Sequence, residues 1–143
     1  MPNANAKKGS RWEAAVRDFL REVFGRVVIR PRQEGYVDIG DLHLSPFVLQ
    51  AKDWKTLAAA LNEGLNGAQK QAKATGEPYG AAVVKRRNKP VGLAYLVMTL
   101  ADFRDLIARL RRAEELLARH APEVFHTEHL PQPETENETD PEE

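Results

Sequence analysis

The stretch that decides the fold is GYVDIGDLHLSPFVLQAK, residues 35–52, and its pattern predicts a β-hairpin. Leu42 and Leu44 are apolar at a spacing of two, and residues 47–49 form an apolar run of strand length. Ser45-Pro46 lies between the two runs and is a turn signal. The sequence therefore predicts two short strands joined by a tight turn.

The length of the turn determines which residues share a face of the hairpin. Pairing about a two-residue turn places Leu44 opposite Phe47 and Asp41 opposite Gln50. Opposed residues share a face of a sheet, and so do residues two apart on one strand. We therefore expect Asp41, Gln50 and Lys52 to project to the same side.

Asp38 has the opposite parity to this set. It would join the same face only if the turn had an odd number of residues or the first strand had a bulge, and the sequence leaves this open. Acidic groups at the entry and a Gln-x-Lys pair at the exit can hold a metal ion and a cation over a phosphodiester. The alternative is that the aspartates are turn or edge-strand acids and Lys52 is a solvated strand end.

Length and composition exclude several other classes of protein. A chain of 143 residues fits one domain with an ordinary core. It has no cysteine, which excludes disulfides, thiolate metal sites and a cysteine nucleophile. The polar start and the absence of any run of about 20 apolar residues predict a soluble, cytoplasmic protein.

The formal net charge of zero conceals two oppositely charged regions. Residues 120–143 hold eight of the 21 acidic residues and no Lys or Arg, so residues 1–119 keep 13 acidic against 21 basic residues, a net charge of +8. A basic body suits a protein that binds the nucleic-acid backbone. We expect residues 120–143 to be a disordered, acidic tail, either a solubilising extension or a mimic that competes with DNA.

Hydrophobic spacing predicts the order of the remaining elements. Ser10 and Glu13 match a capping box at the start of the first helix. The expected order is a helix over 11–24, a strand over 27–30, the hairpin, a helix over 54–75, strands over 79–85 and 91–98, and a helix over 100–119. The glycines at 64 and 67 weaken the case for one continuous middle helix. The order predicts an α/β fold, a mixed sheet with helices on both faces.

Five short motifs carry a resemblance to a known family. They are Trp12-Glu13, Asp38-Ile39-Gly40-Asp41, Val48-Leu49-Gln50-Ala51-Lys52-Asp53, Val84-Lys85-Arg86-Arg87-Asn88-Lys89 and Tyr95-Leu96-Val97-Met98. In order and spacing they resemble the PD-(D/E)xK nuclease superfamily, and more specifically the Holliday-junction-resolvase-like endonucleases of actinobacteria and their phages. The resemblance covers residues 10–108 and implies a restriction-endonuclease-like α-β-β-β-α-β core, so that 1–119 would be a nuclease-like domain.

One residue departs from the pattern of this superfamily. The position two before the lysine is usually Glu or Asp, whereas here it is Gln50. Some branches, among them Mrr-like restriction endonucleases, carry a Gln-x-Lys form. A glutamine oxygen is a neutral ligand for Mg²⁺, so the site would depend more strongly on its remaining carboxylates.

The resemblance implies a role for each residue of the site. Asp41 or Asp38 would bind Mg²⁺, or Mn²⁺ in its place, directly, and Gln50 and the carbonyl of Ala51 would complete the protein ligands. Lys52 would orient or deprotonate the attacking water and neutralise the phosphate. Glu13 would bind a metal directly or through water; its alternative role is to cap its helix.

Seven cations are predicted DNA-phosphate contacts, with solvated loop charge as the alternative. Four lie between two strands and three lie near the start of the first helix: Lys85, Arg86, Arg87 and Lys89, and Lys7, Lys8 and Arg11.

Three functions remain open on the sequence alone. The first is a metal-dependent endonuclease for four-way DNA junctions, for which paired incisions require a homodimer. The second is a nuclease for linear or modified DNA, and the third is a DNA-binding module in which Gln50 marks a lost metal site.

Overall fold

The computed structural model describes residues 4–28 and 42–124, with the side chains described from Arg11 onward. The chain divides into two compact units, Met1–Asp102 and Phe103–Glu143. Asp38 and Asp41, and the side chains of Lys7 and Lys8, lie outside the described residues.

Four strands form a mixed sheet in the order β1-β2-β3-β4. They are β1 (Leu42–Leu44), β2 (Phe47–Gln50), β3 (Tyr79–Val84) and β4 (Tyr95–Val97). The β1–β2 and β3–β4 pairs are antiparallel, and the β2–β3 pair is parallel. In the β1–β2 pair Leu44 lies opposite Phe47, which confirms the predicted hairpin and its two-residue turn.

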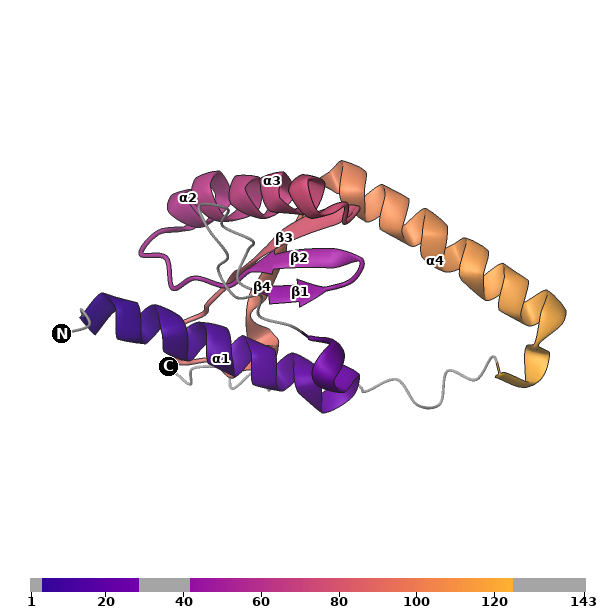
Figure 1. Cartoon of the computed structure of the whole chain (residues 1–143), viewed down its shortest axis with the longest axis horizontal. Coiled ribbons are helices and arrows are strands. Elements are labelled where there is room, and N and C mark those ends of the chain that lie inside the picture. The colour runs from indigo at the N-terminus through magenta and orange to yellow at the C-terminus, as the bar shows by residue number, and fades with distance from the viewer. Residues whose placement is uncertain (1–3, 29–41, 125–143) are drawn as a thin grey trace, which may run out of the picture. The chain divides into compact units, whose positions relative to one another are not determined.

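Helices cover both faces of this sheet, as predicted (Figure 1). Helix α1 (Ala4–Phe24) covers one face. The other face is covered by a helical run of three parts, α2 (Leu57–Ala59), a π-helical segment (Ala60–Leu65) and α3 (Asn66–Thr75). The middle helix is therefore continuous over 57–75. At Gly64, one of the two glycines that weakened this prediction, the helix is π-helical instead of α-helical. Gly76, with φ 75°, ends it in the left-handed conformation.

Two predicted features at the start of the chain are wrong. Ser10 lies inside α1, which begins at Ala4, so Ser10 and Glu13 are not a capping box. Val27 belongs to a 3-10 helix, Gly25–Val27, instead of a strand. The Arg21 guanidinium donates to the carbonyl of Val28 at 2.9 and 3.2 Å, so a side chain takes the oxygen that a strand partner would use. Residues 29 and 30 of the predicted strand lie outside the described part.

The last predicted strand is shorter than expected. Residues Val91–Leu93 form a 3-10 helix, and only Tyr95–Val97 pair with β3. Pro90 precedes this helix and cannot donate a ladder hydrogen bond.

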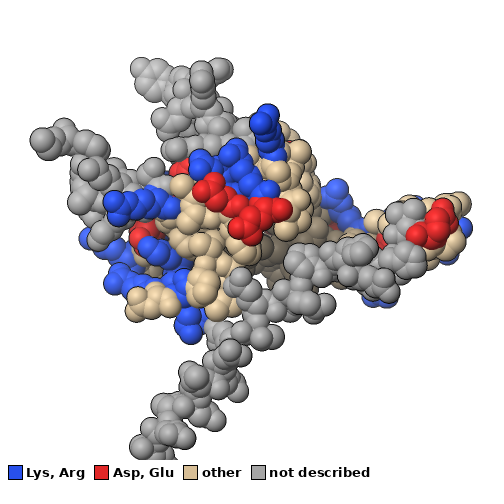
Figure 2. All heavy atoms as spheres, turned by 90° about the horizontal axis from the view of Figure 1, so that it is seen from below, with Lys and Arg blue, Asp and Glu red and all other residues tan. Residues whose placement is uncertain are grey.

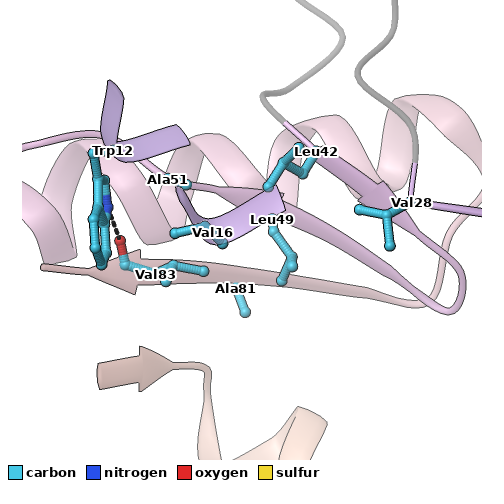
Figure 3. Close-up of a cluster of buried hydrophobic side chains, with 8 residues drawn as sticks. All are labelled: Trp12, Val16, Val28, Leu42, Leu49, Ala51, Ala81 and Val83. Atoms are coloured by element: carbon cyan, nitrogen blue, oxygen red, sulfur yellow. Dashed lines mark hydrogen bonds between the residues drawn. The ribbon is translucent and has the colours of Figure 1, made fainter. Parts of the chain in front are cut away.

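The face of the sheet toward α1 carries the main core (Figure 3). Trp12 and Val16 of α1 pack with side chains of the strands and their flanking segments: Val28, Leu42, Leu49, Ala51, Ala81 and Val83. The Trp12 indole nitrogen donates to the carbonyl of Val83 at 3.4 Å, the dashed line in Figure 3. This contact ties α1 to the end of β3.

The face toward α3 is packed by small residues instead. A Cβ on Gly80 of β3 would overlap the carbonyl group of Ala68 in α3. The backbones of helix and strand therefore touch directly, which only a glycine at this position permits. Ala68, Ala72 and Ala82 line the same layer and are buried.

Helix α4 (Leu100–His120) follows the sheet and was predicted over nearly the same residues. The Thr99 hydroxyl oxygen accepts from the Asp102 backbone nitrogen at 3.2 Å and caps its first turn. No residue of α4 is buried. Among the described residues, no helix has the length and apolar character needed to span a membrane.

Candidate active site

The candidate site lies where the carboxyl ends of β2 and β3 meet. Because these strands are parallel and Gln50 pairs with Ala82, the segments that follow them leave the same edge of the sheet. Asp53 Oδ2 lies 3.3 Å from Lys85 Nζ, which joins the two segments in an ion pair. Ligands of open α/β sheets bind outside the carboxyl ends of the strands, so a ligand is expected at this edge.

Helix α1 supplies the third wall of the site. The Trp12 indole, which donates a hydrogen bond to the Val83 carbonyl, has its ring centroid 5.8 Å from Lys85 Nζ. Arg11, one residue earlier, lines a cavity of about 500 Å³ together with residues from both strand ends, namely Asp53, Lys85, Arg87 and Asn88. We call this space the basic cavity. It brings together three cations and one carboxylate from segments that are far apart in the sequence.

The surface around this edge is rich in positive charge. Figure 2 looks onto the side that α1 covers and shows Lys and Arg side chains gathered toward the end where α1 begins. Of the described cations predicted to contact DNA, Arg11, Lys85 and Arg87 line the basic cavity. Lys89 is exposed but does not line it.

Arg86 has a different environment from its two neighbours. Its guanidinium lies 4.7 Å from the centroid of the Tyr95 ring and donates to the carbonyl of Leu93 at 3.4 Å. These contacts hold the turn after β3 against β4. Arg86 therefore positions the loop that carries Lys85 and Arg87.

Gln50 is 3% exposed and points toward α3. A Cβ on Gly67 of α3 would lie 3.7 Å from its amide nitrogen, so the amide lies against the helix backbone. Its amide atoms are not among the buried side-chain atoms that lack a hydrogen-bond partner, which in the described residues are Trp54 Nε1 and Gln71 Oε1. His43, opposite Val48, has the same parity as Gln50, is half-buried and is not among the predicted site residues.

The predicted ligands are divided between the two faces of the sheet. Ala51 faces the core under α1, and Glu13, 8% exposed, belongs to that helix. Gln50 lies on the α3 face, whereas Lys52 follows the end of β2 and is exposed. Gln50 and Glu13 could contact one ligand only past the open edge of the sheet.

A metal site is only partly represented in the described residues. Within residues 4–28 and 42–124 no three His, Cys, Asp or Glu side chains are grouped so as to hold a metal ion. The buried Gln50 amide has the chemistry of a neutral oxygen ligand, and Glu13 is a buried carboxylate. The other expected carboxylates, Asp38 and Asp41, are outside the described part.

Sequence reasoning missed two residues of the basic cavity. Asp53 was not among the predicted site residues, but it is half-buried and paired with Lys85. Asn88 lines the cavity with φ 58°, in a turn whose backbone bends sharply. The signal for Asp53 was its position directly after Lys52, at the end of a strand that has a parallel neighbour.

Comparisons with protein-family models, curated proteins and solved structures found no match. The resemblance to PD-(D/E)xK nucleases rests on the sequence motifs. The structure shows a general α/β fold with a four-stranded mixed sheet.

Proposed function

We propose that this protein is a metal-dependent DNA endonuclease that hydrolyses phosphodiesters at the carboxyl ends of β2 and β3. The observation that carries the proposal is the basic cavity, in which Arg11, Lys85 and Arg87 converge beside the Gln50-Ala51-Lys52 segment. Asp53 offsets one of these three charges, so the cavity lining keeps a formal net charge of +2 and attracts anions. A DNA backbone is a polyanion that fits such a surface.

The cavity residues would position the DNA strand. Arg11 and Arg87 present guanidinium groups, which bind phosphate oxygens through two parallel hydrogen bonds. Lys85 is already paired with Asp53, so a phosphate would replace or share that partner. Because these contacts go to the backbone, they would set the register of the DNA without reading its sequence.

Mg²⁺, or Mn²⁺ in its place, would be held by Glu13, Gln50 and the carbonyl of Ala51 together with Asp38 and Asp41. When bound, such an ion supplies positive charge for the phosphate and lowers the pKa of water. Lys52 is exposed just beyond the end of β2, where its ammonium group can neutralise a phosphate and orient water beside it.

We propose a four-way DNA junction as the favoured substrate and a homodimer as the active form. This part rests on the resemblance to junction resolvases and on the requirement for two incisions in opposed strands. The alternatives are a nuclease for linear or modified DNA and a DNA-binding module without catalysis. The position of Gln50 and Glu13 on opposite faces of the sheet favours the DNA-binding module without catalysis.

The decisive experiment compares a labelled four-way junction with its matched linear duplex, at one salt concentration, in Mg²⁺, Mn²⁺ and EDTA. We expect paired nicks on the junction, lost in EDTA and in Lys52→Ala. Lys55→Ala is the matched control, because Lys55 is also exposed but lies three residues further from the end of β2. It should cleave like the wild type.

Each other outcome selects a different function. Equal cleavage of junction and duplex would indicate a nuclease for linear DNA. Binding without cleavage in either metal would indicate the DNA-binding module. Cleavage that survives Lys52→Ala would refute the proposed site.

A further inference from the structure

Helix α4 carries a stripe of large apolar residues that are partly exposed in the described part of the chain. Phe103, Leu110 and Leu117 recur every seven residues and leave 49%, 51% and 40% of their surface exposed. Leu106 and Ile107 lie between them and are half-buried. A helix of 21 residues owes most of its stability to the packing of its apolar face. The stripe is therefore a surface that a partner can stabilise by covering it.

The seven-residue spacing indicates what kind of partner. Apolar residues repeated at this interval form the seam along which two helices pack side by side. Leu110 is the midpoint of α4, and Phe103 and Leu117 lie seven residues to either side of it. Two copies of α4 centred on Leu110 would therefore bring apolar residues together whether they run parallel or antiparallel.

The exposed area is large enough for such a contact. A large side chain has an area of about 200 Å². By that measure the exposed apolar residues of α4 leave roughly 500 Å² uncovered, so two copies would bury roughly 1,000 Å², the lower bound for a specific interface. These residues are the stripe leucines and phenylalanine, with Leu100 and Leu116 bordering them.

We propose that α4 is the dimer surface of this protein and packs against α4 of a second copy through the stripe centred on Leu110. The inference rests on the proposed function only for the reason why two copies are needed, namely incision of two strands. The assembly itself can be measured without DNA.

The first test is the mass of the full chain in solution, measured by light scattering after size exclusion. A dimer has about 32 kDa, twice the chain mass of 16.1 kDa. Leu110→Glu places a charge in the seam and should give about 16 kDa, half the dimer mass. Ala108→Glu adds the same charge to the same helix, but Ala108 lies on the opposite face and is exposed, so this variant should remain a dimer.

A cross-linking test supports the mass measurement and does not depend on a charged variant. The chain has no cysteine, so Leu110→Cys introduces a single thiol at the centre of the stripe. Under oxidation it should form a covalent dimer, whereas Ala108→Cys should form no covalent cross-link, because the two thiols lie on opposite outer faces of the helix pair. A wild-type mass of one chain, a Leu110→Glu dimer, or equal cross-linking of both cysteine variants would overturn the inference.

Cleavage assays separate this inference from the proposed function. A monomeric Leu110→Glu protein should still nick one strand of a junction but lose the paired nicks. If no form of the protein cleaves DNA, the proposed function fails, while the mass and cross-linking results still decide the role of α4.

Discussion

The two faces of the sheet are packed in different ways. Toward α1 the contact is made by large side chains, with Trp12 and Leu42 buried in one cluster. Toward α3 it is made by backbone, because Gly80 lies directly against Ala68. A core of large side chains is destabilised when a substitution removes volume, whereas a close backbone contact is destabilised when a substitution adds volume. The candidate ligands are divided between the same two faces, so the packing of each face controls a different part of the site.

The largest expected effect is on the α3 face. Gly80→Ala places a methyl group where the Ala68 carbonyl lies, and neither backbone can move without separating α3 from β3. We expect a loss of more than about 3 kcal/mol in the free energy of unfolding, measured by urea denaturation. Gly67→Ala is the control, because its methyl would meet Gln50 at an ordinary 3.7 Å and gains helix propensity. Equal losses for both variants would contradict the close approach at Gly80.

The α1 face should respond to the opposite change. Leu42 is fully buried, and Leu42→Ala leaves a cavity that its neighbours fill only partly. We expect a loss of about 3 kcal/mol in the same denaturation experiment. Leu57→Ala, at a leucine 58% exposed, should cost well under about 1 kcal/mol. A small effect of Leu42→Ala would mean that this cluster is not the main core.

DNA affinity should distinguish the strand ends from the outer surface of α3. Arg87 lines the basic cavity, and Arg87→Ala should weaken binding of any DNA sequence and reduce the slope of log affinity against log salt by about 1. Lys70 of α3 is exposed and does not line the cavity, so Lys70→Ala should leave the slope unchanged. A salt titration of binding measures both variants. Equal slopes for both would remove the cavity from the DNA surface.

The smallest expected effect concerns the ion pair between the two strand ends. The side chains of Asp53 and Lys85 are 26% and 39% exposed, so solvent screens their attraction, and Asp53→Asn should change the free energy of unfolding by less than about 1 kcal/mol. It should raise DNA affinity a few-fold, because Lys85 is then free to bind a phosphate. Weaker binding would instead assign Asp53 a direct role in the site.

Local patterns predicted the elements that depend on neighbouring residues. The hairpin follows from alternation and a two-residue turn, and its register was confirmed at Leu44 and Phe47. Helix α4 follows from the helical spacing of its apolar residues, and its start agrees with the cap at Thr99. Both elements are short-range, so the residues that determine them are adjacent in the sequence.

Two predictions failed at the start of the chain, each for its own reason. Ser10 has the composition of a cap, but α1 extends beyond it to Ala4. Val27 has the β-branched side chain of a strand, yet the Val28 carbonyl is bound by Arg21. A run of β-branched residues does not by itself show that a side chain on the preceding helix will bind its backbone.

By itself the sequence determined the order of the long helices and of strands β1 to β4, the hairpin register and the basic character of residues 1–119, because periodicity and charge are properties of neighbouring positions. Only the tertiary structure decided that Arg11, Lys85 and Arg87 share one cavity. It also placed Gln50 on the α3 face, away from the helix that carries Glu13. The physical reason is that these arrangements depend on the parallel pairing of β2 with β3 and on which helix covers each face, and both bring together residues that are far apart in the chain.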